Sequence, residues 1–118
     1  MEFRIERFND SEEVRLLKLA GALNHGSYSE LKKSLREEFE ASNFLIILDC
    51  SEMTLISSLV VGSLFTTHQL LKSHRGCLVL SGCSEIVLET LRSLSLEDSF
   101  HLVEDVPSAR DFLKTYLQ

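Results

Sequence analysis

The sequence predicts an α/β fold, in which helices pack against a sheet of largely parallel strands. Two short segments, 44–48 (FLIIL) and 77–80 (CLVL), are unbroken apolar runs, a pattern typical of strands that are buried on both faces of a parallel sheet. Each run is followed by a segment in which apolar residues recur at helical spacing. This alternation favours parallel pairing, because the crossover between two parallel strands usually contains a helix.

The amino-terminal segment predicts a β-hairpin joined to that sheet. Residues 3–8 alternate apolar and charged side chains, as in a half-buried strand, and a polar turn at residues 9–13 leads into an apolar segment at residues 14–20. We therefore expect the first strand to be antiparallel to its neighbour. The full prediction is a mixed sheet of about five strands with four helices, in the order ββαβαβαβα and with right-handed crossovers.

A capping signal predicts where the first helix starts. Ser27 stands three residues before Glu30, a spacing that lets the two side chains satisfy unpaired backbone amides at a helix start. The apolar residues that follow form one stripe that would cover the sheet, namely Tyr28, Leu31, Leu35 and Phe39. The solvent side is expected to carry Lys32, Lys33, Arg36 and Glu37.

Similar patterns predict the remaining elements. Residues 58–73 form a helix whose apolar positions are Val61, Leu64, Phe65 and Leu71. Ser84 is a candidate N-cap for a third helix with a stripe at Val87, Leu88 and Leu91. A short strand is expected at residues 100–103. The last helix is expected from about 107 to 117, capped by Asp105, with inward-facing Ala109, Leu113 and Tyr116.

Length and composition indicate one domain over residues 1–118. The chain is 44% hydrophobic, and a chain of this size buries roughly two-thirds of its unfolded surface. Pro107 is the only proline, and no repeat or low-complexity tract divides the sequence. The net charge of -6 disfavours nucleic acid as a partner, because binding to phosphates needs clustered Lys and Arg.

Cysteine usage and the apolar segments favour a cytoplasmic protein. Cys50, Cys77 and Cys83 have no spacing typical of a metal motif or a disulfide framework, so we expect reduced thiols buried in the core. The longest apolar stretches are too short for a membrane span, so no direct membrane insertion is expected. The alternating amino terminus does not resemble a signal or transit peptide.

No pattern of residues predicts an enzyme, a metal site or a cofactor. No two histidines have the spacing of a zinc-binding helix. No serine lies in the G-x-S-x-G turn of many hydrolases, and no glycine cluster matches a phosphate-binding loop. Carboxylate pairs such as Glu12 with Glu13 fall in polar turns, where solvation explains them. We expect the isolated glycines to be turn residues with positive φ between elements, namely Gly21, Gly26, Gly76 and Gly82.

Two adjacent serines, Ser57 and Ser58, stand between the apolar strand and the helix at 58–73. Connections of this kind often carry function, because they lie at the carboxyl edge of a parallel sheet. Either serine could serve as the helix N-cap, a role that serine commonly fills. A phosphate at this position would also be tolerated, because the first amides of a helix are unpaired and the positive end of its dipole lies there.

Three segments carry a set of residues in a consistent order and spacing. Residues 48–64 (LDCSEMTLISSLVVGSL) contain Leu48, Asp49, Ser51, Thr54, Ile56, Ser58, Gly62 and Leu64. Gly21 and Leu23 precede them, and Leu96, Phe100 and Ala109 follow near the end of the chain. With these residues the sequence resembles the STAS domain family of anti-sigma-factor antagonists over nearly its full length, and residues 48–64 are similar to the central family motif.

This resemblance implies a non-enzymatic regulatory module that binds proteins and takes part in partner switching. Ser58, or alternatively Ser57, would accept a phosphate from a serine kinase that is itself an anti-sigma factor or a relative of one, and a phosphatase could reverse the step. The output would be transcription regulation. The expected docking surface surrounds this serine and comprises Asn24, Ser57, Leu59, Val60, Ser63, Thr66 and Thr67.

The sequence departs from the family around the expected phosphoacceptor. Ser57 replaces the usual aspartate, Leu59 and Val60 replace a small residue and a glycine, and Asn24 replaces an acidic residue. Asn24 and Asp49 also have simpler roles open to them, as a turn residue and a strand-end residue bonded to its own loop. The alternative function is a constitutive STAS subunit of a lipid-trafficking ABC transporter or of a signalling scaffold.

Overall fold

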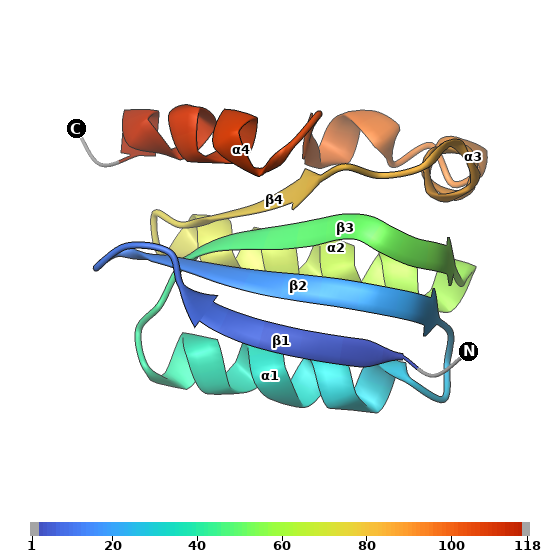
Figure 1. The fold of residues 1–118 in the computed structure, drawn as a ribbon, viewed down its shortest axis with the longest axis horizontal. Coiled ribbons are helices and arrows are strands. Elements are labelled where there is room, and N and C mark those ends of the chain that lie inside the picture. The colour runs from blue at the N-terminus through green and yellow to red at the C-terminus, as the bar shows by residue number, and fades with distance from the viewer. Residues whose placement is uncertain (1–2, 117–118) are drawn as a thin grey trace.

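Five strands form one mixed sheet in the computed structural model, which describes residues 3–116 (Figure 1). The strands lie in the order in which they occur along the chain. The first pair is antiparallel and the other three pairs are parallel, which confirms the predicted fold class. The strands are β1 (Arg4–Asn9), β2 (Val14–Leu23), β3 (Leu45–Ile56), β4 (Cys77–Ser81) and β5 (His101–Val103).

Four α-helices cover the two faces of this sheet. They are α1 (Tyr28–Glu40), α2 (Ser58–Ser73), α3 (Glu85–Ser93) and α4 (Val106–Leu113), and two short 3-10 turns span Glu97–Ser99 and Lys114–Tyr116. The first three helices contribute to the larger core cluster, whereas α4 packs against the opposite face. Helix α2 begins and ends at the predicted residues.

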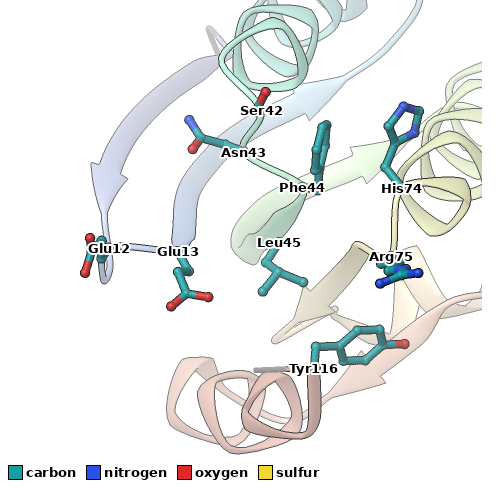
Figure 2. A pocket seen from close by; sticks show the side chains of 9 residues that line it. All are labelled: Glu12, Glu13, Ser42, Asn43, Phe44, Leu45, His74, Arg75 and Tyr116. Carbon is teal, nitrogen blue, oxygen red and sulfur yellow. The ribbon is translucent and has the colours of Figure 1, made fainter. Parts of the chain in front are cut away.

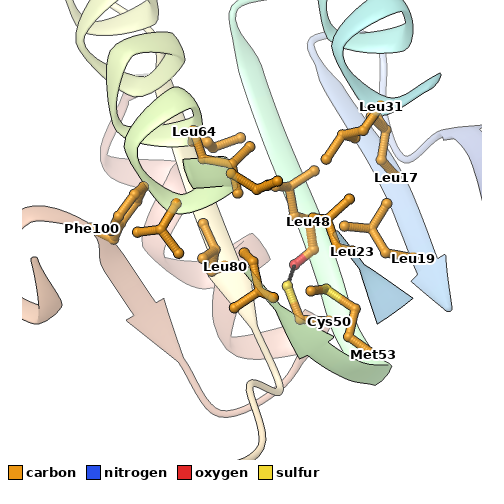
Figure 3. Close-up of a cluster of buried hydrophobic side chains, with 14 of the residues drawn as sticks. Leu17, Leu19, Leu23, Leu31, Leu48, Cys50, Met53, Leu64, Leu80 and Phe100 are labelled. Atoms are coloured by element: carbon orange, nitrogen blue, oxygen red, sulfur yellow. Dashed lines mark hydrogen bonds between the residues drawn. The ribbon is translucent and has the colours of Figure 1, made fainter. Parts of the chain in front are cut away.

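The larger core cluster lies between the sheet and the helices α1, α2 and α3. Leu17, Leu48 and Leu80 come from three adjacent strands and face Leu31 of α1 and Leu64 of α2 (Figure 3). Successive residues of β3 alternate between the two clusters, with Ile46 and Leu48 in the larger one and Leu45 and Ile47 in the smaller. The expectation that this strand is buried on both faces is confirmed.

Strand β3 is much longer than the sequence predicts. We expected it to end at residue 48, but it continues to Ile56, where it pairs with the end of β2. The β2–β3 pairing shifts register twice, between Lys18 and Ala20 and between Gly21 and Ala22. These irregularities break the strict alternation of apolar and polar residues by which a strand is recognised, so the second half of β3 reads as a polar loop.

Gly21 lies inside β2, which corrects its predicted place between elements. Its φ angle is +94°, a value that residues with a Cβ atom rarely adopt, and it stands at the second shift in register. Strand β2 therefore continues to Leu23 rather than ending at residue 20. The positive φ expected of the four isolated glycines is confirmed for Gly21 and Gly82, whereas for Gly26 and Gly76 the expectation is wrong.

The carboxyl-terminal elements follow the prediction with one correction. The Ser84 hydroxyl and the Asp105 carboxylate accept hydrogen bonds from the amides of Val87 and Ser108, so both predicted caps are confirmed. Helix α4 ends at Leu113, and the tighter turn that follows leaves the Tyr116 side chain 37% exposed rather than facing inward. The predicted helix end at residue 117 lies outside the described residues.

A buried carboxylate ties the hairpin to α1. The Glu38 side chain is 1% exposed and accepts hydrogen bonds from Arg7 Nε at 3.1 Å, Arg15 Nε at 3.0 Å and Asn43 Nδ2 at 2.9 Å. Burial alone would raise the pKa of Glu38, but these hydrogen bonds outweigh it and lower the pKa below its ordinary value. Glu38 therefore remains charged and fully paired.

The Gly76→Ala substitution tests the close approach of two loops. An added Cβ atom at Gly76 would overlap the backbone carbonyl of Phe44, so the free energy of unfolding is expected to fall by about 1–3 kcal/mol. The matched control is Gly62→Ala in α2, where an added Cβ atom meets nothing within 4 Å. That change should raise the free energy of unfolding by up to about 1 kcal/mol, because alanine favours the helix. Urea unfolding of both variants checks this, and equal effects would contradict it.

Acid should destabilise the fold through His68. Its Nδ1 accepts a hydrogen bond from the Leu78 amide at 3.3 Å, and burial, with smaller contributions from His101 and Lys72, lowers its pKa from 6.5 to about 4. Between these two values the unfolded chain binds the proton more tightly than the folded one, so stability falls as the pH falls through this window. The loss approaches about 3 kcal/mol at its lower end.

Unfolding measured from pH 7 to pH 5 separates this effect from the titration of carboxylates. His68→Gln keeps an acceptor for the Leu78 amide but does not titrate, so its stability should vary less across the window than that of the unmodified chain. Parallel profiles for the two proteins would show that His68 is not the responsible group.

Candidate functional site

The connections after β2 and β3 meet at the carboxyl edge of the parallel strands. Leu23 and Ile56 are paired in register as the last residues of their strands, and the Ser57 amide donates a hydrogen bond to the Leu23 carbonyl at 3.0 Å. Asn24 therefore follows directly beside the start of α2. The structure brings together three of the predicted site residues, Asn24, Ser57 and Ser58.

Ser57 is the N-cap of α2. Its backbone is extended, with φ -83° and ψ 154°, and its hydroxyl oxygen accepts a hydrogen bond from the Val60 amide at 3.3 Å. The side chain is half-buried in this position. Of the two serines that the sequence offered as caps, the structure assigns the role to Ser57.

Ser58 is the first residue of α2, and its side chain is exposed. It lies where the backbone amides of the first helical turn point outward and the dipole of the helix is positive. The connection between β3 and α2 is a single residue, Ser57, because β3 runs to Ile56. Ser58 is thus held by a strand end and a helix start rather than by a long loop.

The Asn24 side chain belongs to a small hydrogen-bonded turn before α1. The side-chain Oδ1 of Asn24 accepts a hydrogen bond from the Ser27 backbone amide at 3.0 Å, and the backbone amide of Asn24 donates one to the Ser27 hydroxyl at 3.0 Å. The Ser27 hydroxyl donates to the Ala22 carbonyl at 2.8 Å instead of capping α1. The helix start predicted from the capping box is therefore confirmed, but the predicted capping contact is wrong.

Leu59 and Val60 lie on different sides of α2. The Leu59 side chain is 60% exposed, next to the exposed Ser58, whereas Val60 is completely buried in the larger core cluster. The rotation of about 100° between successive helical residues is enough to turn Val60 toward the sheet while Leu59 stays in solvent. The prediction that Val60 lies on the docking surface is wrong, while Leu59 is exposed as that prediction requires.

Three residues with hydroxyl groups further along α2 were predicted to belong to the docking surface, namely Ser63, Thr66 and Thr67. The Thr66 and Thr67 hydroxyls donate to the carbonyls of Gly62 and Ser63, both at 3.2 Å. Thr66 is exposed, and Ser63 and Thr67 are half-buried. They do not join the hydrogen bonds around Ser57, so they can serve only as a contact surface beyond it.

Two exposed aliphatic residues at the same edge were missed by sequence reasoning. Leu55, near the end of β3, is 41% exposed, and Ile86, in the first turn of α3, is 59% exposed. The end of β3 and the starts of α2 and α3 lie at one end of the molecule (Figure 1). For Ile86 the sequence did hold a signal, because this residue follows the predicted cap Ser84 by two positions and lies outside the predicted apolar stripe of α3. For Leu55 there was no such signal. With Leu59, these residues make the carboxyl edge rich in exposed aliphatic groups, and we call Leu55, Leu59 and Ile86 the aliphatic edge.

A cavity at the opposite edge of the sheet is separate from these residues. It has a volume of about 290 Å³ and is lined by Glu12, Glu13, Ser42, Asn43, Phe44, Leu45, His74, Arg75 and Tyr116 (Figure 2). The two glutamates come from the hairpin turn and lie across the cavity from His74 and Arg75 (Figure 2). Both are exposed, in agreement with the expectation that solvation explains them.

Two general features complete the description of residues 3–116. No three or more His, Cys, Asp or Glu side chains in this part of the chain are grouped so that they could hold a metal ion. No helix within it is long and apolar enough to cross a membrane. His68 and His101 do approach each other, with ring centroids 5.4 Å apart, although their sequence positions do not suggest it.

Solved structures with the same fold include regulatory proteins. A Thermotoga maritima protein proposed to be an anti-sigma factor antagonist has a TM-score of 0.83 and 19% identity, over 95% of this chain and 94% of that chain. The unphosphorylated form of SpoIIAA, an anti-sigma factor antagonist of Bacillus, has a TM-score of 0.71 and 19% identity, over 96% of this chain and 98% of that chain. A structure of phosphorylated SpoIIAA also has the same fold. A chain of the stressosome, a signal integration and transduction hub, has a TM-score of 0.68 and 17% identity, over 98% of this chain and 99% of that chain.

These identities are too low to show more than a common fold. No curated protein is similar in sequence at a significant level. The family itself is shown by a sequence model, that of the STAS domain, which matches residues 7–109 and so spans β2 to β5 with half of β1 and half of α4. The chain belongs to the STAS domain family.

Proposed function

We propose that the chain is a non-enzymatic regulatory module of the anti-sigma-factor-antagonist type, and that phosphorylation of Ser58 controls its binding to a partner. The observation that carries this proposal is the exposed Ser58 hydroxyl at the start of α2, bordered by exposed Leu59. The same fold in proteins described as anti-sigma factor antagonists supports it. SpoIIAA, one of these, exists in a phosphorylated form.

Ser58 is a better phosphoacceptor than Ser57. A kinase must reach the hydroxyl, and Ser58 is exposed whereas Ser57 is half-buried and occupied by the Val60 amide. Phosphorylation of Ser57 would displace the cap of α2 and cost about 1 kcal/mol of stability from that contact. Modification of Ser58 leaves the cap in place.

A phosphate on Ser58 would change the surface without unfolding the helix. It adds about -1.5 to -2 charges, and the positive end of the α2 dipole favours negative charge at this position. The same charge lies next to Leu59, which is 60% exposed. A partner that covers Leu59 would have to remove water from the phosphate as well, which opposes docking.

The partner that fits this arrangement is a serine kinase that binds its own substrate. Before transfer it contacts Ser58 together with the aliphatic edge, and after transfer it is released. In the anti-sigma pathway this kinase is the anti-sigma factor or a relative of it, a phosphatase restores the hydroxyl, and the output is transcription regulation in the cytoplasm. The departure from the family at residue 59 then becomes a specificity feature, because Leu59 offers an apolar contact where a small residue is usual.

A second candidate is a constitutive subunit of a signalling scaffold. It is favoured by the likeness to a stressosome chain, which covers 98% of this chain and 99% of that one. The aliphatic edge would then be buried permanently against a neighbouring subunit, and Ser58 would remain unmodified. The two candidates differ in whether binding depends on the charge at residue 58.

Protein isolated from its native cells should carry one phosphate, removable by phosphatase, on the peptide that contains Ser58. With the purified partner kinase, Ser58→Asp should weaken binding at least tenfold, or by about 1.4 kcal/mol, while Ser58→Ala should bind normally. Gln69→Asp is the matched control, because it places the same charge on the exposed side of α2, about three turns away and outside the expected docking surface. Unmodified Ser58 under every growth condition, or equal weakening by both aspartates, would favour the scaffold.

Alanine substitutions separate the two serines by their effect on stability. Ser57→Ala should lower the free energy of unfolding by about 1 kcal/mol, because the Val60 amide loses its acceptor. Ser58→Ala removes an exposed hydroxyl and should change it by less than about 0.5 kcal/mol. Urea unfolding of the two variants measures the difference, and a larger loss at residue 58 would contradict the assignment of the cap.

A further inference from the structure

Two cysteines that are 33 residues apart in the sequence meet beneath the carboxyl edge of the sheet. Cys50 lies on β3, is 2% exposed and belongs to the larger core cluster (Figure 3). Cys83 follows the end of β4 by two residues and packs against the same cluster. The pairing of Asp49 with Ser81 sets the two strands so that the residues just beyond them are neighbours.

The backbones at this point are close enough for a cross-link. A Cβ atom built on Gly82 would lie 3.1 Å from the Cβ atom of Ser51, so the segments that carry Cys83 and Cys50 run side by side. The two thiols are close enough for each to shift the pKa of the other, and the Cys50 thiol donates a hydrogen bond to the Leu48 carbonyl at 3.6 Å. A disulfide needs two cysteines on adjacent segments, and here the adjacent segments bring both cysteines to the same core cluster.

The two thiols differ in access and in reactivity. Cys83 is half-buried and lines a cavity of about 470 Å³ together with Gly82, Leu88 and Leu102, whereas Cys50 lies behind it in the core. The neighbouring Cys50 thiol lowers the pKa of the Cys83 thiol. The neighbouring Cys83 thiol, together with burial, raises the pKa of Cys50. An accessible thiol with thiolate character beside a second, protonated thiol is the arrangement of a redox-sensitive pair.

We infer that Cys83 and Cys50 form a redox-sensitive dithiol that a hydroperoxide converts into an intramolecular disulfide. The Cys83 thiolate attacks one oxygen of hydrogen peroxide, the O–O bond breaks, and Cys83 becomes a sulfenic acid, while the leaving hydroxide takes up the proton that the Cys83 thiol had released and departs as water. The Cys50 sulfur then attacks the Cys83 sulfur, the S–O bond breaks, and the Cys50 proton leaves with the hydroxyl as a second water. Two thiols are oxidised and one hydrogen peroxide is reduced to water.

The third cysteine provides a control within the same chain. Cys77 begins β4, at the end of that strand away from Cys83, and is completely buried. Burial raises its pKa to about 11, so its thiolate is scarce at neutral pH. Peroxide should therefore leave Cys77 unchanged under conditions that link the other two cysteines.

The experiment treats the reduced, purified full chain with hydrogen peroxide and then blocks free thiols with an alkylating agent after unfolding. We expect a product that has lost two hydrogen atoms, in which only Cys77 is alkylated and the peptides of Cys50 and Cys83 are joined until a reductant is added. Cys83→Ser should abolish the product, whereas Cys77→Ser should form it as the unmodified chain does.

Two results would overturn the inference. One is irreversible oxidation of Cys83 while Cys50 remains open to alkylation, and the other is a link that joins two chains or involves Cys77. Because Cys50 is buried, Cys50→Ala can also disturb the fold, so Cys83→Ser carries the test and circular dichroism checks that each variant is folded. In a folded Cys50→Ala protein, Cys83 should accumulate as a sulfenic acid that a dimedone probe captures. None of these readouts depends on a partner or on Ser58.

Discussion

The parallel pairing of β2 with β3 is the constraint on which the rest of the structure depends. It continues past the end of β4, to the pair Leu23 and Ile56, and it tolerates two shifts in register on the way. Because both strands end together, the connections that follow them emerge at the same edge, and the Ser57 amide can bond to the Leu23 carbonyl. The start of α2 is thereby fixed against the sheet, and with it the position and exposure of the residues that we propose to be functional.

At this edge, neighbouring residues divide structural and surface roles between them. Ser57 caps the helix while Ser58 stays exposed, and Val60 fills the core while Leu59 faces solvent. The first division follows from the extended backbone of Ser57, which lies outside the helix, and the second from the rotation of about 100° between successive helical residues. A modification or a contact at Ser58 and Leu59 therefore leaves the packing beneath them intact. This separation lets a binding surface change its charge while the fold stays the same, which is what a switch between partners requires.

The elements that the sequence predicts well are those with a local cause. The apolar run at residues 44–48, the helical spacing over residues 58–73 and the caps Ser84 and Asp105 all act within a few residues, and each is present. The failures have non-local causes. The second half of β3 exists because β2 pairs with it, Glu38 is buried because Arg7 and Arg15 arrive from the hairpin, and the meeting of Cys50 with Cys83 depends on the register of β3 with β4. No local pattern records such contacts. The candidate site could be predicted only in part. The motif indicated the two serines, but the structure was needed to show that Ser57 is the cap and that Val60 is buried.

The central claim is that Ser58 accepts a phosphate without a change in the fold. Amide chemical shifts measured by NMR for the chain with serine and with phosphoserine at residue 58 test it most directly. The account predicts changes confined to the first turn of α2 and the neighbouring turn around Asn24, with the helical shifts of the rest of α2 preserved. Shifts that show α2 unwinding, or changes spread through β3 and the core, would contradict it.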